Sequence, residues 1–171
     1  MGRPTWFSKA EARQWLPADP VVGAKQELPP RLVQRMACLH LVDTARGQSL
    51  PFETGQVAGS RIVTEVVGRD GSDTSMVRLR IHGSTKAQAA GRTMRIRMRG
   101  LARFDLKSGR FVEFELVALG VRTGGTQFNG RGREPGPSRV GFLFRLAPAG
   151  WRVPPAFVNF YQVDWVKTPT R

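Results

Sequence analysis

The chain of 171 residues carries 27 Lys and Arg against 13 Asp and Glu, a formal net charge of +14, and 40% of its residues are hydrophobic. This length and apolar content suffice for one folded domain, which excludes a chain that is disordered by composition. A single Cys and two His exclude an intramolecular disulfide and a Cys-based zinc site within one chain. We expect neither a metal nor a cofactor.

Membrane-spanning and exported chains carry recognisable apolar segments. No apolar run here approaches the ~20 residues of a membrane helix, and the N-terminal MGRPTWFSKAEARQWLP has no apolar stretch typical of a signal peptide. We therefore expect no transmembrane segment. The expected compartment is the cytoplasm, or the cell envelope or periplasm if the chain is the trimmed mature part of an exported protein.

The helix signals lie in the first third of the chain. Residues 1–27 are predicted to form an irregular extension in which SKAEARQWL favours a short helix, with Ser8 as N-cap and Glu11 completing a capping box. The main helix is predicted over about residues 30–46. Two prolines set its start, no breaker interrupts it, and Gly47 occupies the position favoured just past a helix end.

The rest of the chain is predicted to be β-structure. Period-two alternation bounded by turn residues marks five segments from about Val57 onward: RIVTEVV, MVRLRIHG, RTMRIRMRGLARFDL, RFVEFELVALGV and GFLFRL. The expected fold class is α+β, a curved antiparallel sheet of about five strands packed on one main helix, with irregular N- and C-terminal extensions. Residues 28–166 would form a single β-rich domain, followed by a tail of residues 167–171.

One hairpin register can be predicted from a turn. The segment KSG is expected to be a three-residue hairpin loop in which Gly109 takes a positive φ. This loop pairs Leu106 with Arg110, Phe104 with Val112, Ala102 with Phe114, Arg103 with Glu113 and Leu101 with Glu115.

Alternation on two strands predicts a basic face. Opposite the apolar side, MVRLRIHG and MRIRMRG carry the candidate residues Arg78, Arg80, Arg95 and Arg97, and the sequence places no acidic residue opposite them. They are candidates for contact with a polyanion, such as nucleic acid, an anionic polysaccharide, an acidic lipid or an acidic protein surface. The alternative is a solvated sheet face, with the Arg excess reflecting a high-GC genome. No aromatic residue interleaves with these arginines, and no nucleic-acid-binding motif is present.

The end of the predicted main helix carries a second candidate site. On a helical wheel His40 and Asp43 fall on the apolar arc, so Asp43 would be buried and would need a compensating donor from His40, Arg46 or a loop amide. In a structural role, Asp43 and Arg46 fasten the helix end to the sheet and to the following GQSLPF turn. In a catalytic role, Asp43 orients His40 as a general base. Cys38 lies on another face of the helix and cannot act with His40.

The glycine-rich segment GVRTGGTQFNGRGREPGP invites comparison with a phosphate-binding loop. Its backbone amides and the side chains of Arg122, Arg131 and Arg133 are candidates for holding an anion. No GK[ST] follows and no helix begins there, so a mobile loop is the alternative.

The segments LPPRLVQRMACLHLVDTARG, RLRIHGS, GLARFDLKSGRFVEFELVALGVRTGGTQFN and GFLFRL, which span about residues 28–147, follow one another in this order. In this the chain resembles an uncharacterised family of planctomycete-type bacterial proteins, with a helix bearing HLVD-x-x-RG before a β-rich region. The resemblance implies a bacterial origin and a cell-envelope setting. It carries no known activity, so no catalytic residue is transferred.

Together these observations favour a non-enzymatic binding or structural module, associated with the envelope, whose basic face contacts polyanions. Two alternatives stay open. One is a hydrolase-like enzyme that uses His40 and Asp43, and the other is a nucleic-acid-binding protein that uses the basic face.

Overall fold

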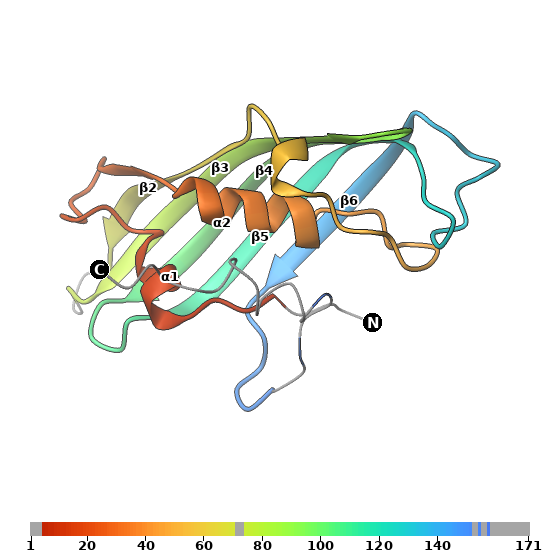
Figure 1. Cartoon of the computed structure of the whole chain (residues 1–171). Helices are drawn as coiled ribbons and strands as arrows, with labels where there is room; N and C mark the ends of the chain where they lie inside the picture. The colour runs from red at the N-terminus through yellow and green to blue at the C-terminus, as the bar shows by residue number, and fades with distance from the viewer. Residues whose placement is uncertain (1–4, 71–73, 152–153, 155–156, 158–171) are drawn as a thin grey trace.

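The computed structural model describes residues 5–70, 74–151, 154 and 157, and these residues build one antiparallel sheet of six strands (Figure 1). The lateral order of the strands is their order along the chain. The strands are β1 (Lys25–Glu27), β2 (Arg61–Arg69), β3 (Met76–Ala89), β4 (Arg92–Asp105), β5 (Arg110–Gly124) and β6 (Ser138–Arg145). The predicted α+β class with an antiparallel sheet is confirmed. The predicted strand number is one too low, because β1 has three residues and is too short to show alternation.

Several short segments, and not one main helix, cover one face of this sheet (Figure 1). They are α1 (Lys9–Arg13), α2 (Pro30–Arg35), which continues as a π-helix over Met36–His40, and a 3-10 turn at Thr54–Gln56. The predicted sheet on one main helix is therefore wrong in its detail. No helix among the described residues is both long and apolar enough to cross a membrane.

The long helix ends at His40, six residues before its predicted end. The Leu41 amide donates to the Met36 carbonyl at 2.9 Å, five residues back, and Leu41 itself has a non-helical backbone (φ −102°, ψ 51°). Two residues later the Asp43 side chain accepts a hydrogen bond from the Ala45 amide at 3.3 Å. Such side-chain bonds to the local backbone compete with helical bonds, which is why the helix does not continue through this segment.

Residues 5–27 pack against the sheet as part of the fold. The predicted capping box is confirmed: the Ser8 amide donates to Glu11 Oε2 at 2.9 Å, and the Glu11 amide donates to Ser8 Oγ at 3.2 Å. The other Glu11 oxygen accepts from Arg35 Nη1 at 2.8 Å, and both side chains are buried. Trp15, which is 1% exposed, lies edge-on to two Phe rings of β5. Residues 5–27 thus supply a helix, a strand and a large core side chain to the fold.

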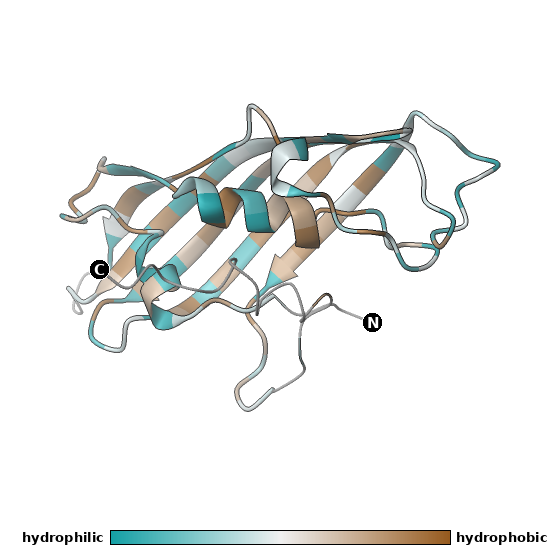
Figure 2. Cartoon of the chain, viewed as in Figure 1, coloured by the Kyte–Doolittle hydropathy of each residue, from teal (hydrophilic) through white to brown (hydrophobic). Residues whose placement is uncertain are grey.

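Alternation along the long strands separates a core face from an outer face. Buried positions of β3 and β4 turn toward the covering segments, and the residues between them are mostly exposed. Hydrophobic and hydrophilic bands accordingly alternate along the strands in Figure 2. The inward residues of the two central strands are Val77, Leu79, Ile81, Met94, Ile96, Met98, Ala102 and Phe104, all buried. We use "outer face" below for the side of the sheet turned away from α1 and α2.

The β4–β5 hairpin follows the predicted register only in part. The pairs of Leu101, Ala102 and Arg103 with Glu115, Phe114 and Glu113 are confirmed. The pairs predicted nearer the turn are wrong, because Phe104 pairs with Phe111 and a β-bulge shifts the register after Arg103. The bulge turns Phe111 inward, where its ring meets those of Phe104 and Trp15 at 5.1 and 6.0 Å.

The turn of this hairpin has four residues, 106–109, between Asp105 and Arg110. The Asp105 carboxylate accepts from the amides of Lys107 at 2.8 Å and Ser108 at 3.2 Å, which closes the turn one residue earlier than predicted. Gly109 has a φ of 67°, and this prediction is confirmed. The predicted C-terminal extension and tail lie mostly outside the described residues.

Candidate functional site

The outer face of β3 and β4 gathers most of the exposed cations of the sheet. Directly paired positions bring Arg78 beside Arg103, His82 beside Arg99, Ser84 beside Arg97 and Lys86 beside Arg95. All four arginines predicted as the basic face, Arg78, Arg80, Arg95 and Arg97, are exposed on this side. The structure thus brings the predicted residues onto one surface.

Acidic residues neutralise one end of this surface. Glu65 on β2 stands directly opposite Arg80, with its Oε2 3.4 Å from Arg80 Nη1. Asp70 lies 3.9 Å from Arg78 and 3.6 Å from Arg103. The prediction that no acidic residue stands opposite Arg80 is wrong, and Arg78 also has a nearby carboxylate. The sequence did not reveal either contact, because both depend on the β2–β3 register.

The other end keeps its charge. Lys86, Arg95, Arg97 and Arg99 are exposed and form no side-chain ion pair or hydrogen bond with any described residue. We call these four residues the cation strip. Lys86 and Arg95 are direct cross-strand partners, and like charges in this position destabilise a sheet. The stability of the sheet therefore does not explain why these four cations lie together.

An aliphatic surface runs beside the cation strip. It consists of Val117, Leu119 and Val121 on β5 and Leu143 on β6, which are 40%, 61%, 40% and 54% exposed. We call these residues the apolar strip. Across the β4–β5 ladder Arg95 pairs with Val121, Arg97 with Leu119 and Arg99 with Val117. Each arginine of the cation strip thus has an aliphatic neighbour. This arrangement was not predicted, although RFVEFELVALGV has apolar residues on both faces.

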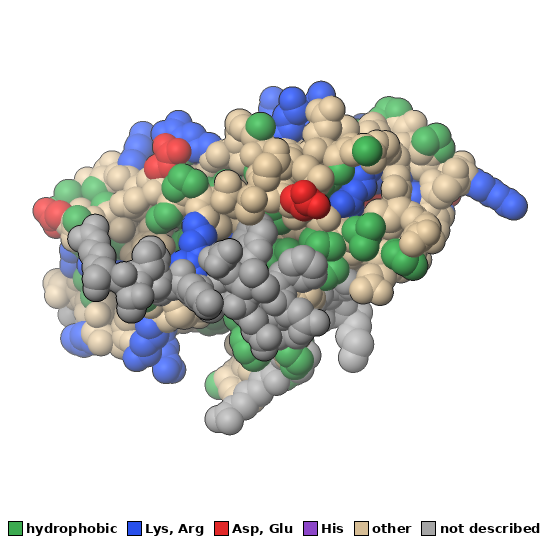
Figure 3. All heavy atoms as spheres, viewed as in Figure 1, with side chains coloured by type: hydrophobic (Ala, Val, Ile, Leu, Met, Phe, Trp, Pro, Cys, Tyr) green, Lys and Arg blue, Asp and Glu red, His purple; other side chains and the backbone are tan. Residues whose placement is uncertain are grey.

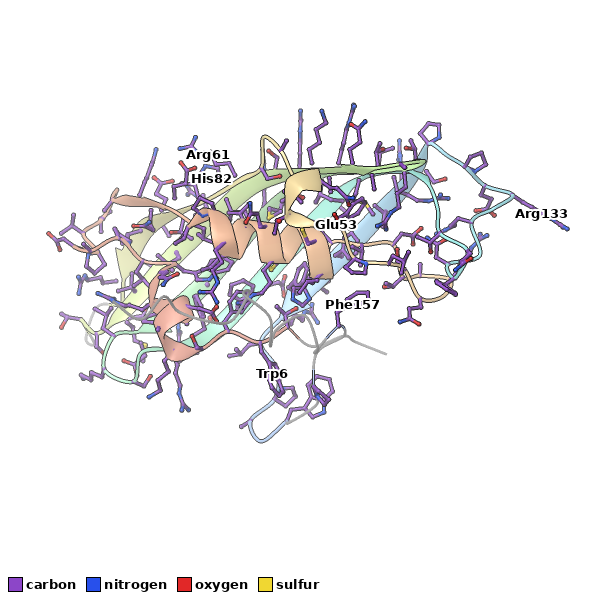
Figure 4. The ribbon with its side chains drawn as sticks, in the orientation of Figure 1. Trp6, Glu53, Arg61, His82, Arg133 and Phe157 are labelled. Carbon is purple, nitrogen blue, oxygen red and sulfur yellow. The ribbon has the colours of Figure 1, made fainter. Side chains whose placement is uncertain are left out.

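An open depression of about 610 Å³ lies across the boundary of the two strips. Its walls come from β2 to β5 and include Arg61, His82, Arg97, Arg99, Val117 and Leu119. Arg61 and His82 lie close together in Figure 4. In Figure 3, which shows the opposite, helix-bearing face, Lys and Arg side chains project along the upper margin of the molecule.

The second candidate site, at the end of the long helix, forms a buried ionic cluster. Asp43 is 4% exposed and accepts two hydrogen bonds from Arg131, from Nε at 2.8 Å and from Nη2 at 3.3 Å. Arg122 Nε lies 3.3 Å from Asp43 Oδ2, without the alignment of a hydrogen bond. Of the donors predicted for Asp43, only the loop amide, that of Ala45, is used. The carboxylate is held by Arg122 and Arg131, which lie in the glycine-rich segment and were not predicted to be its partners.

The structure does not bring His40 and Asp43 together. The hydrogen bonds and ion pairs of Asp43 go to Arg122, Arg131 and the Ala45 amide. Burial, with a smaller effect from the nearby Arg35, lowers the pKa of His40 to about 3. The imidazole is neutral at pH 7 and is a weak base, since a general base works best with a pKa near the operating pH. The geometry therefore does not support the general-base role.

The glycine-rich segment packs against the helix end. Arg46 donates to Glu134, and Arg131 Nη1 donates to the other Glu134 oxygen at 2.9 Å. Hydrogen bonds from these two arginines lower the pKa of Glu134, and the bond from Arg46 has the larger effect. The predicted fastening by Arg46 thus goes to this loop and not to the GQSLPF turn. Arg122 and Arg131 are engaged by the protein's own carboxylates, whereas Arg133 projects from the tip of the loop (Figure 4).

Gly47 has a different role from the one predicted. It lies seven residues beyond the helix end at His40, so it is not the C-terminal cap. Its φ is 152°, and an added Cβ would lie 2.4 Å from the Phe128 carbonyl oxygen. Gly47 is therefore needed for the close approach of the glycine-rich segment.

The part of the chain that the structure describes offers few side chains for metal binding or thiol chemistry. No group of three His, Cys, Asp or Glu side chains there is arranged to hold a metal ion. Cys38 is buried, and burial raises the pKa of its thiol to about 12. The thiolate, which is the reactive form, is therefore scarce at neutral pH.

Comparison with known proteins gave no relative: no family model, no curated protein and no solved structure matched the chain. The resemblance to a planctomycete-type family stays a prediction. The function is therefore argued from the geometry alone.

Proposed function

We propose that the protein is a non-enzymatic binding module whose outer sheet face contacts a polyanion through the cation strip. The observation that carries this proposal is the contrast between two groups of cations on one face. Arg78, Arg80 and Arg103 each have a carboxylate within 4 Å. The four residues of the cation strip have none among the described residues, and yet they occupy neighbouring positions.

The physical argument is one of missing counter-charge. Like charges on paired strands repel, and a ligand with several anionic groups removes that repulsion while it releases bound counterions. Arginine suits such a ligand, because its planar guanidinium donates two parallel hydrogen bonds to a phosphate, sulfate or carboxylate group. This replaces the predicted set of four arginines by Lys86, Arg95, Arg97 and Arg99.

Nucleic acid is a less favoured polyanion. Proteins that bind single strands without sequence preference stack bases on aromatic side chains. The outer positions of the described strands β2 to β6 carry no Phe, Trp or Tyr. We also propose an envelope setting for the protein, and the resemblance to the planctomycete-type family is what supports it.

Retention on immobilised heparin tests the proposal. One variant replaces Lys86, Arg95, Arg97 and Arg99 by Gln. A matched control also removes four positive charges, by replacing Arg78, Arg80, Arg133 and Arg145 by Gln. Exposed substitutions usually change stability by about 0.5 kcal/mol or less each, so both variants are expected to fold.

The cation-strip variant is expected to elute at clearly lower salt than the control. Its affinity should also depend less on salt, with a log–log slope shallower by roughly 0.7 to 0.9 for each lost anion contact. Equal elution of the two variants would mean that only net charge matters, and the proposal would then be rejected.

A further inference from the structure

Contact with a hydrophilic polyanion leaves the apolar strip unexplained. Leu119 and Leu143 are 61% and 54% exposed, and Val117 and Val121 are each 40% exposed. Aliphatic side chains gain nothing from a sulfated sugar or a phosphate backbone, but they gain free energy when an apolar partner removes them from water. Scattered exposed apolar residues are common, whereas a contiguous group marks an interaction site.

The sheet register sets the two strips in fixed correspondence. In one row Arg99, Val117 and Leu143 follow one another across β4, β5 and β6, and in the next row Leu119 follows Arg97. Neighbouring strands lie about 4.8 Å apart. A matching ligand therefore carries anionic groups beside an aliphatic region, with the two separated by roughly 5 to 10 Å. The depression of about 610 Å³ spans this boundary.

We propose that the outer face docks on a bilayer surface rich in anionic phospholipid, with headgroup phosphates over the cation strip and the upper acyl chains over the apolar strip. This inference rests on the proposed polyanion contact and names its chemical class. Charge complementarity supports it, since basic residues beside a membrane are attracted to anionic headgroups. Arg and Lys also combine an aliphatic stem with a charged end, so they suit the boundary between acyl chains and headgroups.

A second copy of the chain fits this face less well. Packing two sheets through their outer faces would bury Arg95, Arg97 and Arg99, which have no carboxylate partner among the described residues. Burying charges without partners is strongly unfavourable. The net charge of +14 on each copy opposes such pairing further.

Sedimentation with lipid vesicles tests the inference. Phosphatidylcholine vesicles with about one-third phosphatidylglycerol are compared with pure phosphatidylcholine vesicles. An apolar-strip variant replaces Leu119 and Leu143 by Gln, and a cation variant replaces Arg97 and Arg99 by Gln. The matched control replaces Val22 and Leu50 by Gln, because these two residues are 67% and 49% exposed but lie outside the outer face.

The parent protein is expected to bind the anionic vesicles and not the neutral ones. The apolar-strip variant should bind anionic vesicles about tenfold more weakly and still elute from heparin like the parent. The cation variant should lose both interactions, and the control should keep both. Val117→Thr with Val121→Thr, which preserves side-chain shape, should weaken vesicle binding without changing heparin elution.

Different results would overturn the membrane inference and the proposed function. Parental vesicle binding by both apolar-strip variants, or a parent that binds heparin but not anionic vesicles, overturns the membrane inference and leaves the polyanion contact standing. Unchanged heparin elution of the cation variant overturns the proposed function itself. A dimer in sedimentation equilibrium that the apolar-strip substitutions dissociate, with vesicle binding unaltered, assigns the face to a second copy and also overturns the membrane inference.

Discussion

Replacing Asp43 tests whether the buried ionic cluster is structural. Asp43→Ala removes the acceptor of two Arg131 hydrogen bonds and of the Ala45 amide. It also leaves Arg122, 2% exposed, without the carboxylate 3.3 Å from its Nε. The change therefore breaks a buried charge pair in the connection between helix end and sheet.

The expected loss in the free energy of unfolding depends on the hydrogen bonds that Arg122 and Arg131 keep in the variant. Breaking a buried ion pair by removing one partner costs about 3 to 5 kcal/mol. Arg122 keeps its bonds to the carbonyls of Gly124 and Glu134, at 2.7 and 2.8 Å, and Arg131 keeps its bond to the Glu134 carboxylate. We therefore expect a loss near the lower limit, about 3 kcal/mol. Asp43→Asn keeps one acceptor, so the expected loss is smaller, about 2 kcal/mol.

Urea unfolding and thermal melting measure this cost. For a chain of this size 1 kcal/mol corresponds to about 2 to 4 °C, so Asp43→Ala should lower Tm by roughly 6 to 12 °C. The matched control is Asp19→Ala, since Asp19 is an exposed carboxylate, and it should melt with the parent. An Asp43→Ala protein that also melts within about 2 °C of the parent would refute the structural role.

Three further predictions concern single buried or constrained residues. The pKa of His40 is about 3 in the folded protein and an ordinary 6.5 in the unfolded chain, so at intermediate pH only the unfolded chain binds a proton at this residue. Proton binding favours unfolding, so the free energy of unfolding is highest above pH 6.5 and decreases as the pH falls toward 3. Urea unfolding from pH 7.5 to 5 should therefore show a loss about 2 kcal/mol smaller in His40→Gln than in the parent, and equal losses in the two proteins would contradict this reasoning. Gly100→Ala places a Cβ 2.4 Å from a β5 carbonyl oxygen and should lower the free energy of unfolding by roughly 1 to 3 kcal/mol, whereas Gly55→Ala, with open space at its Cβ, should not; equal stabilities would contradict the close approach. Ellman's reagent at pH 8 should label Cys38 only in the unfolded chain, and rapid labelling of the native protein would contradict its burial.

Local signals in the sequence predicted local structure. The Ser8 and Glu11 capping box, the alternation along β3 and β4, and the positive φ of Gly109 all depend on residues a few positions apart, and all three are present. Strand β1 escaped prediction because three residues show no period. The bulge on β5 escaped because no local pattern marks it, and Trp15, whose ring Phe111 contacts, lies almost a hundred residues earlier in the chain.

The candidate sites were predictable only as far as their chemistry is local. The need of a buried Asp43 for a donor is apparent from the helical wheel, but Arg131, its main partner, lies 88 residues away. Likewise the basic face follows from alternation on β3 and β4, but Glu65, which neutralises Arg80, comes from β2. The choice among several possible partners is made by the tertiary fold, which no local pattern encodes.

The strands lie side by side in the order in which the ribosome makes them, and this order has a consequence for folding during synthesis. During translation each new strand from β3 onward finds its partner at the current edge of the sheet, so each of these pairings joins consecutive strands and closes a short loop. The Asp43 carboxylate, in contrast, leaves the ribosome long before Arg122 and Arg131. Nascent chains that end before β5 therefore expose both an unpaired strand edge and an uncompensated acid at the helix end. Residues 110–134 are thus the segment whose emergence supplies both the strand that pairs with β4 and the two arginines that compensate Asp43.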